Sequence, residues 1–233
     1  MSIRENFDIS AYLVVGPENT KGRPVKEIIS AAISAGFSCI QIRSKVASAI
    51  ELIEMTRQAA SVIASAGKSE KVALLVDDRL DVVLADRKLG IKVDGIHVGQ
   101  TDIPVDICRE YLGEESIIGL SARTEELFEY IKTVDVSKID YFGAGPLHKT
   151  ATKLDCGLDS TGKIIVRSLD ELSKLKMLSP IPVVVGGGVK IFDIPQLAQT
   201  KVDGFFVVSA VAEADNPELA ARELVKAWIK ANE

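Results

Sequence analysis

Cysteine, histidine and tryptophan are scarce in this chain of 233 residues, which contains three, two and one of them, respectively. The cysteines Cys39, Cys108 and Cys156 are odd in number, lie far apart and form no CxxC pair, so the sequence argues against a zinc site and a disulfide framework. Unpaired cysteines are typical of a reducing compartment, and we therefore expect a cytoplasmic protein.

Long apolar runs and clusters of basic residues are also absent. No apolar run approaches the ~20 residues needed to span a bilayer, and the polar start MSIRENFDIS lacks the apolar centre of a signal peptide. The net charge is −5, so we expect neither a membrane nor a nucleic acid as partner. Anionic small molecules remain candidates, because an acidic protein can hold a basic pocket, and a homo-oligomer remains open.

Apolar residues, by contrast, make up 47% of the chain. They form short runs that alternate with segments of helical period. The expected strands are 11–15, 37–42, 72–76, 95–98, 116–120, 140–144, 182–186 and 204–208. The expected helices are 25–35, 47–66, 80–86, 104–112, 125–133, 163–178, 194–199 and 217–231. Nearly continuous apolar strands are typical of a parallel sheet covered by helices on both faces.

Eight strands that alternate with eight helices predict an α/β fold, a single (β/α)8 TIM barrel over residues 1–233. Asp193 and the pair Asp215-Asn216 stand before prolines in first helical turns and are expected caps. An open, doubly wound sheet is the alternative. The turn after the first strand reads VVGPENTKG and lacks the GxGxxG of a dinucleotide site, which favours the barrel.

Polar residues follow almost every expected strand, at the end of a barrel where active sites lie. They are Gln41, Arg43 and Lys45; Asp77, Asp78 and Arg79; His97, Gln100 and Asp102; Ser121; the KTATK loop 149–153; Gly186 to Gly188; and Val208 with Ser209. None is specific alone, but their shared placement on one face predicts a site there.

Two kinds of anion site are expected among them. Asp78 and Asp102 follow adjacent strands and could share one Mg²⁺, with Arg43, Lys45 and Lys153 around a multiply charged anion such as pyrophosphate. The competing interpretation of each aspartate is an acid that favours a helix start.

The hydroxyls of Thr150 and Thr152, with backbone amides of 186–188 and 208–209, would suit a phosphate monoester. A solvated loop and a flexible glycine turn are the competing interpretations. His97 is expected inside the barrel as an orienting residue, and His148 has no evident partner, so neither is assigned catalysis.

Short motifs occur along the chain in this order: QIRSK, VDDR, DGIHVGQTD, IGLS, DYFGAGP, TATK, GGG, and VVSA with ADNPE. With them the chain resembles, over nearly its whole length, the thiamine phosphate synthases (thiamine-phosphate pyrophosphorylases). The resemblance implies a (β/α)8 barrel that uses Mg²⁺ to join hydroxymethylpyrimidine pyrophosphate to hydroxyethylthiazole phosphate. The products would be thiamine phosphate and pyrophosphate, formed after dissociative loss of pyrophosphate.

The resemblance also implies roles by position. Contacts with the pyrimidine substrate and its pyrophosphate fall on Gln41, Ile42, Arg43, Ser44, Lys45, Asp77, Ser121 and Lys153, of which Arg43, Lys45, Ser121 and Lys153 would be catalytic. The thiazole phosphate site falls on Thr150, Ala151, Thr152, Gly188, Val208 and Ser209. The Mg²⁺ ligands would be Asp78 and Asp102.

Three positions depart from the family pattern. Asp77 replaces the usual asparagine, Arg123 replaces a common histidine, and 147–149 (LHK) replaces an aromatic-proline pair. The related TenI-like branch, a thiazole tautomerase or regulatory protein on the same barrel, is the main rival interpretation. Its tautomerase uses histidine at the position of Arg123. A sugar-phosphate isomerase and a non-catalytic binding protein are less favoured, the former because no acid–base pair is evident.

Overall fold

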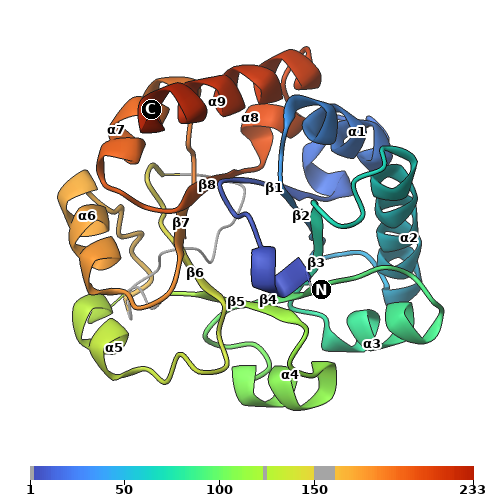
Figure 1. Ribbon diagram of the computed structural model, residues 1–233, viewed down its shortest axis with the longest axis horizontal. Helices are drawn as coiled ribbons and strands as arrows, with labels where there is room; N and C mark the ends of the chain where they lie inside the picture. The colour runs from blue at the N-terminus through green and yellow to red at the C-terminus, as the bar shows by residue number, and fades with distance from the viewer. Residues whose placement is uncertain (1–2, 123–124, 150–160) are drawn as a thin grey trace.

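The computed structural model describes residues 3–122, 125–149 and 161–233. Within these residues, eight parallel strands close into a barrel in the order β1 to β8, with β8 paired to β1 (Figure 1). The strands are β1 Ala11–Val15, β2 Cys39–Ile42, β3 Ala73–Asp77, β4 Gly95–Val98, β5 Ile117–Ser121, β6 Tyr141–Ala144, β7 Val183–Val185 and β8 Gly204–Val207. This confirms the predicted TIM barrel and excludes the open sheet.

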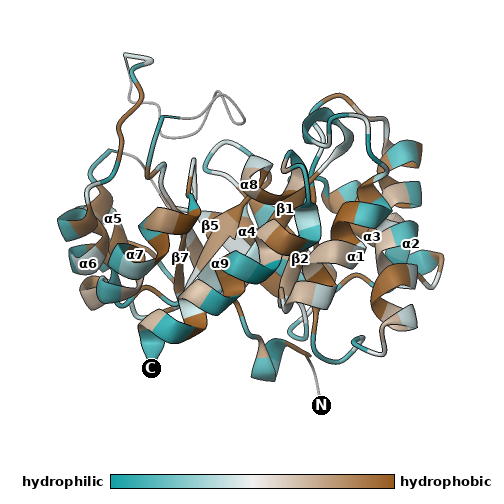
Figure 2. Cartoon of the chain, turned by 90° about the horizontal axis from the view of Figure 1, so that it is seen from above, coloured by the Kyte–Doolittle hydropathy of each residue, from teal (hydrophilic) through white to brown (hydrophobic). Residues whose placement is uncertain are grey.

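Helices surround the strands, with their apolar faces turned to the barrel (Figures 1 and 2). They are α1 Val25–Ala35, α2 Ala49–Ser65, α3 Leu80–Lys88, α4 Val105–Leu112, α5 Leu127–Thr133, α6 Leu169–Leu178, α7 Ile194–Gln199, α8 Ser209–Ala212 and α9 Pro217–Asn232. Three 3₁₀ turns also occur in the described residues: η1 Ile3–Asn6 before β1, η2 Pro17–Asn19 after β1 and η3 Ile191–Asp193 before α7. Among these described segments, no helix has the length and apolar character needed to cross a bilayer.

The predicted helix 163–178 begins too early. It starts at Leu169, because Ser168 and Glu171 form a capping box in which Ser168 Oγ accepts from the Glu171 amide at 3.2 Å. The expected end of the third helix at residue 86 was also wrong, since α3 continues to Lys88. The short helix α8 was not predicted at all.

The two expected caps have different outcomes. The side chain of Asn216 accepts a hydrogen bond from the Leu219 amide at 3.0 Å and caps α9 as predicted. Asp193 makes no side-chain cap to α7. Its carboxylate instead accepts from the Lys190 amide at 2.8 Å and contacts His148 at 2.9 Å, so it joins two loops.

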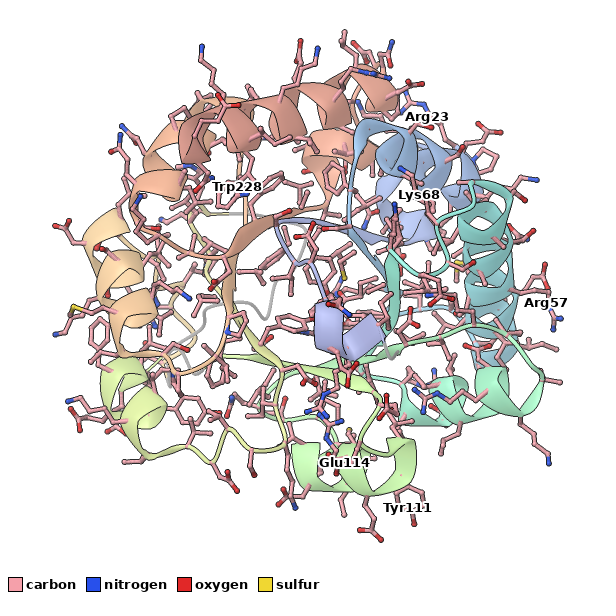
Figure 3. The ribbon with its side chains drawn as sticks, viewed as in Figure 1. Arg23, Arg57, Lys68, Tyr111, Glu114 and Trp228 are labelled. Atoms are coloured by element: carbon pink, nitrogen blue, oxygen red, sulfur yellow. The ribbon has the colours of Figure 1, made fainter. Side chains whose placement is uncertain are left out.

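The buried core has two layers, because successive strand residues point to opposite faces. The outer layer, between strands and helices, contains Ile42 and also Trp228, which points inward from α9 onto Phe205 with ring centroids 5.5 Å apart (Figure 3). The inner layer fills the barrel and contains Tyr12 and Tyr141. Residues next to an outward-facing strand position therefore face the barrel interior.

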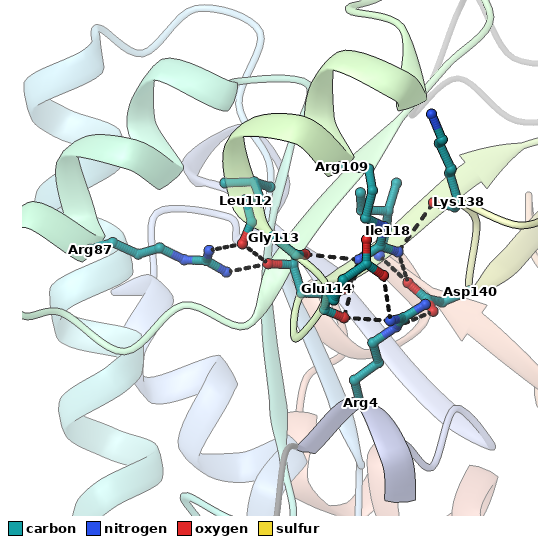
Figure 4. Close-up of polar contacts among 10 residues, drawn as sticks. Arg4, Arg87, Arg109, Leu112, Gly113, Glu114, Ile118, Lys138 and Asp140 are labelled. Carbon is teal, nitrogen blue, oxygen red and sulfur yellow. Dashed lines mark hydrogen bonds and ion pairs between the residues drawn. The ribbon is translucent and has the colours of Figure 1, made fainter.

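The amino-terminal end of the barrel is closed by η1 and a partly buried ion-pair network (Figures 1 and 4). Asp140 accepts from Arg4 Nε at 2.7 Å, from Arg109 Nη2 at 2.9 Å and from the Ile118 amide at 2.7 Å. Arg109 is only 4% exposed. One carboxylate thus ties η1, α4 and two strands together at the end opposite the predicted site.

Candidate active site

The loop after β2 is held by Glu18, a residue of η2 in the neighbouring loop. Glu18 Oε1 accepts from Ser44 Oγ at 2.5 Å and from the Lys45 amide at 3.0 Å. Partial burial opposes the shift, but these hydrogen bonds lower the pKa of Glu18, so the carboxylate stays ionised. The predicted contact Ser44 therefore uses its hydroxyl to shape the loop that presents Arg43 and Lys45.

Arg43 lies beside the carboxylate that departs from the family pattern. Its Nε is 3.0 Å from Asp77 Oδ2, and both side chains are largely buried. The charge added at Asp77 is therefore compensated within the protein. Ile42, in contrast, has its side chain in the outer core layer, so only its backbone faces the site region.

Asp78 and Asp102 are brought together, as predicted. Asp78 has a left-handed backbone (φ 61°), and its Oδ2 accepts from Lys45 Nζ at 2.5 Å. Although burial opposes it, the Lys45 ammonium lowers the pKa of Asp78, whereas burial and the adjoining Asp78 carboxylate raise the pKa of Asp102. The two carboxylates are thus close enough for each to shift the pKa of the other.

This pair fits a Mg²⁺ ion. Asp78 Oδ1 is buried and has no hydrogen-bond donor among the described residues. Asp102 Oδ2 accepts from the Gly99 amide at 2.8 Å, which orients this second carboxylate. No third His, Cys, Asp or Glu in the described part of the chain completes a metal cluster. Mg²⁺ commonly uses one or two carboxylates and fills its remaining positions with water and phosphate oxygens.

Ser121 closes the site on the β5 side. Its Oγ lies 3.0 Å from His97 Nε2, and its carbonyl accepts from Gln100 Nε2 at 2.8 Å. Gln41 is buried inside the barrel and donates from Nε2 to the Tyr12 hydroxyl at 2.6 Å. His97 is therefore an interior residue with side-chain partners, as expected from its strand.

The glycine turn after β7 is ordered by the segment beside it. Gly187 and Gly188 have left-handed backbones (φ 81° and 77°), and the His148 amide donates to the Gly187 carbonyl at 2.9 Å. His148 Nε2 also contacts Asp193, so the histidine does have a partner. Val208 and Ser209 stand where β8 meets α8.

Several predicted residues lie outside the described part of the chain, namely Arg123, Thr150, Ala151, Thr152, Lys153 and Cys156. Sequence reasoning missed Glu18, Tyr12 and Tyr141. Glu18 carries no motif signal, but a tyrosine inside an apolar strand could have been flagged, because a buried phenol needs a hydrogen-bond partner.

Comparisons with known proteins show the family to which the chain is related. Residues 11–211 match the family model described as thiamine monophosphate synthase. The thiamine-phosphate synthase of Corynebacterium efficiens is 38% identical over 223 residues, covering 96% of each chain. That of Natronomonas pharaonis is 33% identical over 220 residues, covering 94% of this chain and 95% of the relative.

Solved structures show the same likeness. Thiamine phosphate pyrophosphorylase from Pyrococcus furiosus superposes with a TM-score of 0.78 at 27% identity, covering 98% of this chain and 100% of that one. A 3-hexulose-6-phosphate synthase shares only the fold, with a TM-score of 0.62 at 16% identity over 94% of this chain and 99% of the other. This chain belongs to the thiamine monophosphate synthase family.

Proposed function

We propose that the protein is a thiamine phosphate synthase, a transferase that joins hydroxymethylpyrimidine pyrophosphate to hydroxyethylthiazole phosphate and releases pyrophosphate. Relatives of that name over nearly the whole chain support this activity. The observation that carries it is the group formed by Asp78, Asp102 and Lys45 at the carboxyl ends of β2 to β4. That group suits a pyrophosphate with a divalent cation, which a tautomerase would not need.

The site residues around Asp78 and Lys45 would each contribute to this reaction. Asp78 and Asp102 would hold Mg²⁺, which supplies positive charge to the departing pyrophosphate when bound. Arg43 and Lys45 bind the same anion and stabilise its charge as the bond to the pyrimidine CH₂ breaks. Glu18 keeps their loop in place. The aminopyrimidine itself stabilises the positive CH₂, so the protein needs no nucleophile and mainly aligns the two substrates.

The remaining assignments extend the proposal to the second substrate. Gly188, Val208 and Ser209, with Thr150 to Thr152, would bind the thiazole phosphate, and Lys153 would bind pyrophosphate.

Two of the cysteines, Cys39 and Cys108, are buried and free, which supports a cytoplasmic protein.

The test incubates purified protein with both substrates and Mg²⁺ and follows thiamine phosphate and pyrophosphate together. We expect equal amounts of both products and loss of both with EDTA. Asp78→Ala and Asp102→Ala should each abolish turnover, whereas Asp106→Ala, which removes an exposed carboxylate on α4, should not. Near-normal rates in either of the first two variants would refute the metal assignment. Binding of thiazole phosphate without product would favour the TenI-like alternative.

A further inference from the structure

An unbroken chain of side-chain hydrogen bonds crosses the barrel interior beneath the site. Gln41 Nε2 donates to the Tyr12 hydroxyl at 2.6 Å, and the two tyrosine hydroxyls lie 2.9 Å apart. Tyr141 then contacts His97 Nδ1 at 2.9 Å, and His97 Nε2 contacts Ser121 Oγ at 3.0 Å. The chain therefore joins two predicted substrate contacts, Gln41 on β2 and Ser121 on β5, through three residues from β1, β6 and β4.

The barrel is packed around this chain. Tyr12 and Tyr141 meet edge to face, with centroids 6.0 Å apart and planes at 81°, and His97 lies 5.4 Å from the Tyr141 ring. A Cβ at Gly119 would lie 2.2 Å from Tyr141 Cζ and 2.5 Å from His97 Nδ1, so only glycine leaves room there. Burial raises the pKa of both phenols, so both keep their protons.

The donor at one end determines the direction of every bond. Tyr12 accepts from Gln41, and the acceptor that the structure offers its own buried proton is the Tyr141 oxygen. Tyr141 must then donate to His97 Nδ1, because a buried hydroxyl proton without an acceptor is costly. Nδ1 is consequently unprotonated and the imidazole proton sits on Nε2. Ser121 Oγ accepts that proton's hydrogen bond and keeps its own proton free.

We propose that Tyr12, Tyr141 and His97 are positioning residues that make Ser121 a hydrogen-bond donor to the substrate's pyrophosphate. The inference rests on the proposed function for its ligand, but not for the direction of the hydrogen bonds. If the hydrogen bonds ran in the opposite direction, Ser121 would donate to His97 and would present only lone pairs to the substrate, which repel a phosphate oxygen.

The wild-type protein provides the first test. A long-range ¹H–¹⁵N correlation spectrum of protein labelled with ¹⁵N-histidine reports which ring nitrogen carries the proton. The chain has only two histidines, and a His97→Gln variant assigns the signals. We expect His97 protonated at Nε2. His97 protonated at Nδ1 would overturn the proposal without any further variant.

A reversal experiment separates the chain of hydrogen bonds from mere packing. Gln41→Glu replaces the first donor by an acceptor once its carboxyl group is ionised. Because burial raises the pKa of a carboxyl group at this position, the spectra are recorded from about pH 7 to about pH 10. Tyr12 should then donate to the new carboxylate, Tyr141 to Tyr12, and His97 to Tyr141, so the proton moves to Nδ1. Adding Tyr12→Phe breaks the link and should restore the Nε2 form. Gln100→Glu makes the same charge change beside Ser121 but outside the chain, and should leave the tautomer unchanged.

Binding of inorganic pyrophosphate with Mg²⁺ then tests the ligand. Ser121→Ala should weaken it roughly tenfold or more, as expected for a lost hydrogen bond to a charged group. Gln41→Glu with Tyr12→Phe should bind more tightly than Gln41→Glu alone by a similar factor, although both carry the same added charge. If the tautomer follows these variants but pyrophosphate does not bind the wild type, the pyrophosphate assignment is refuted. If pyrophosphate binding depends on Ser121 but the tautomer does not respond to Gln41→Glu, the positioning role is refuted and the proposed function stands.

Discussion

Asp86 should make the protein less stable as the pH rises from acidic to neutral. This residue of α3 is fully buried (0% exposed), and neither carboxylate oxygen has a hydrogen-bond partner within the described residues. The nearby Thr56 hydroxyl donates instead to the Leu52 carbonyl at 2.9 Å. Burial raises the pKa of Asp86 from its ordinary 3.8 to about 6, and Thr56 and Arg57 offset only part of this rise.

The sign and size follow from proton linkage. Between about pH 4 and pH 6 the folded protein keeps the Asp86 proton and the unfolded chain loses it, so the free energy of unfolding falls as pH rises. The part of the stability that the Asp86 proton contributes is fully present below this window and is lost above it. A shift of about two pKa units corresponds to about 3 kcal/mol.

The measurement is urea unfolding of the wild type and Asp86→Asn across this range. Other carboxylates affect both proteins alike, so the informative quantity is the difference between their unfolding free energies. That difference should move in favour of Asp86→Asn by up to about 3 kcal/mol between pH 4 and pH 7. Asp170→Asn, an exposed change at the start of α6, is the matched control and should show no such trend. A difference for Asp86→Asn that is constant with pH would refute the reasoning.

Two further variants test other parts of the structure. Asp140→Ala should lower the free energy of unfolding by about 3–5 kcal/mol, because it leaves the buried Arg109 without its carboxylate. Urea unfolding measures this loss. A loss under about 1 kcal/mol, the size expected for a surface ion pair, would contradict the prediction. Glu18→Ala should raise the KM for the pyrimidine substrate with little change in stability, because it frees the loop at Lys45. Glu54→Ala, an exposed change on α2, is its control, and an equal KM in both variants would exclude the anchoring role.

The placement of the site was predictable because it depends on chain order alone. Apolar runs of strand length alternate with helical segments, and in a parallel barrel every strand ends on the same face. Residues directly after strands, such as Asp78 and Asp102, therefore had to gather at one end whatever the details of packing. The sequence analysis misplaced the start of α6 and did not predict α8. Both errors concern helix ends and short helical turns, which leave weak periodic signals in a sequence.

The ordered family motifs added roles to these positions but not contacts. The sequence could not show that Asp77 faces Arg43 at 3.0 Å or that Glu18 holds the next loop. Such pairs join residues from different strands, and the strand register decides whether two side chains share a face.

The sequence by itself thus determined the barrel and the end at which its chemistry lies. Both follow from the order of apolar and polar residues along the chain, which does not depend on how side chains pack. Only the tertiary structure decided which polar atoms meet. The hydrogen-bond chain from Gln41 to Ser121 uses five strands. It exists because closing the barrel turns alternate residues of every strand into one interior, where each buried polar group must find its partner on another strand.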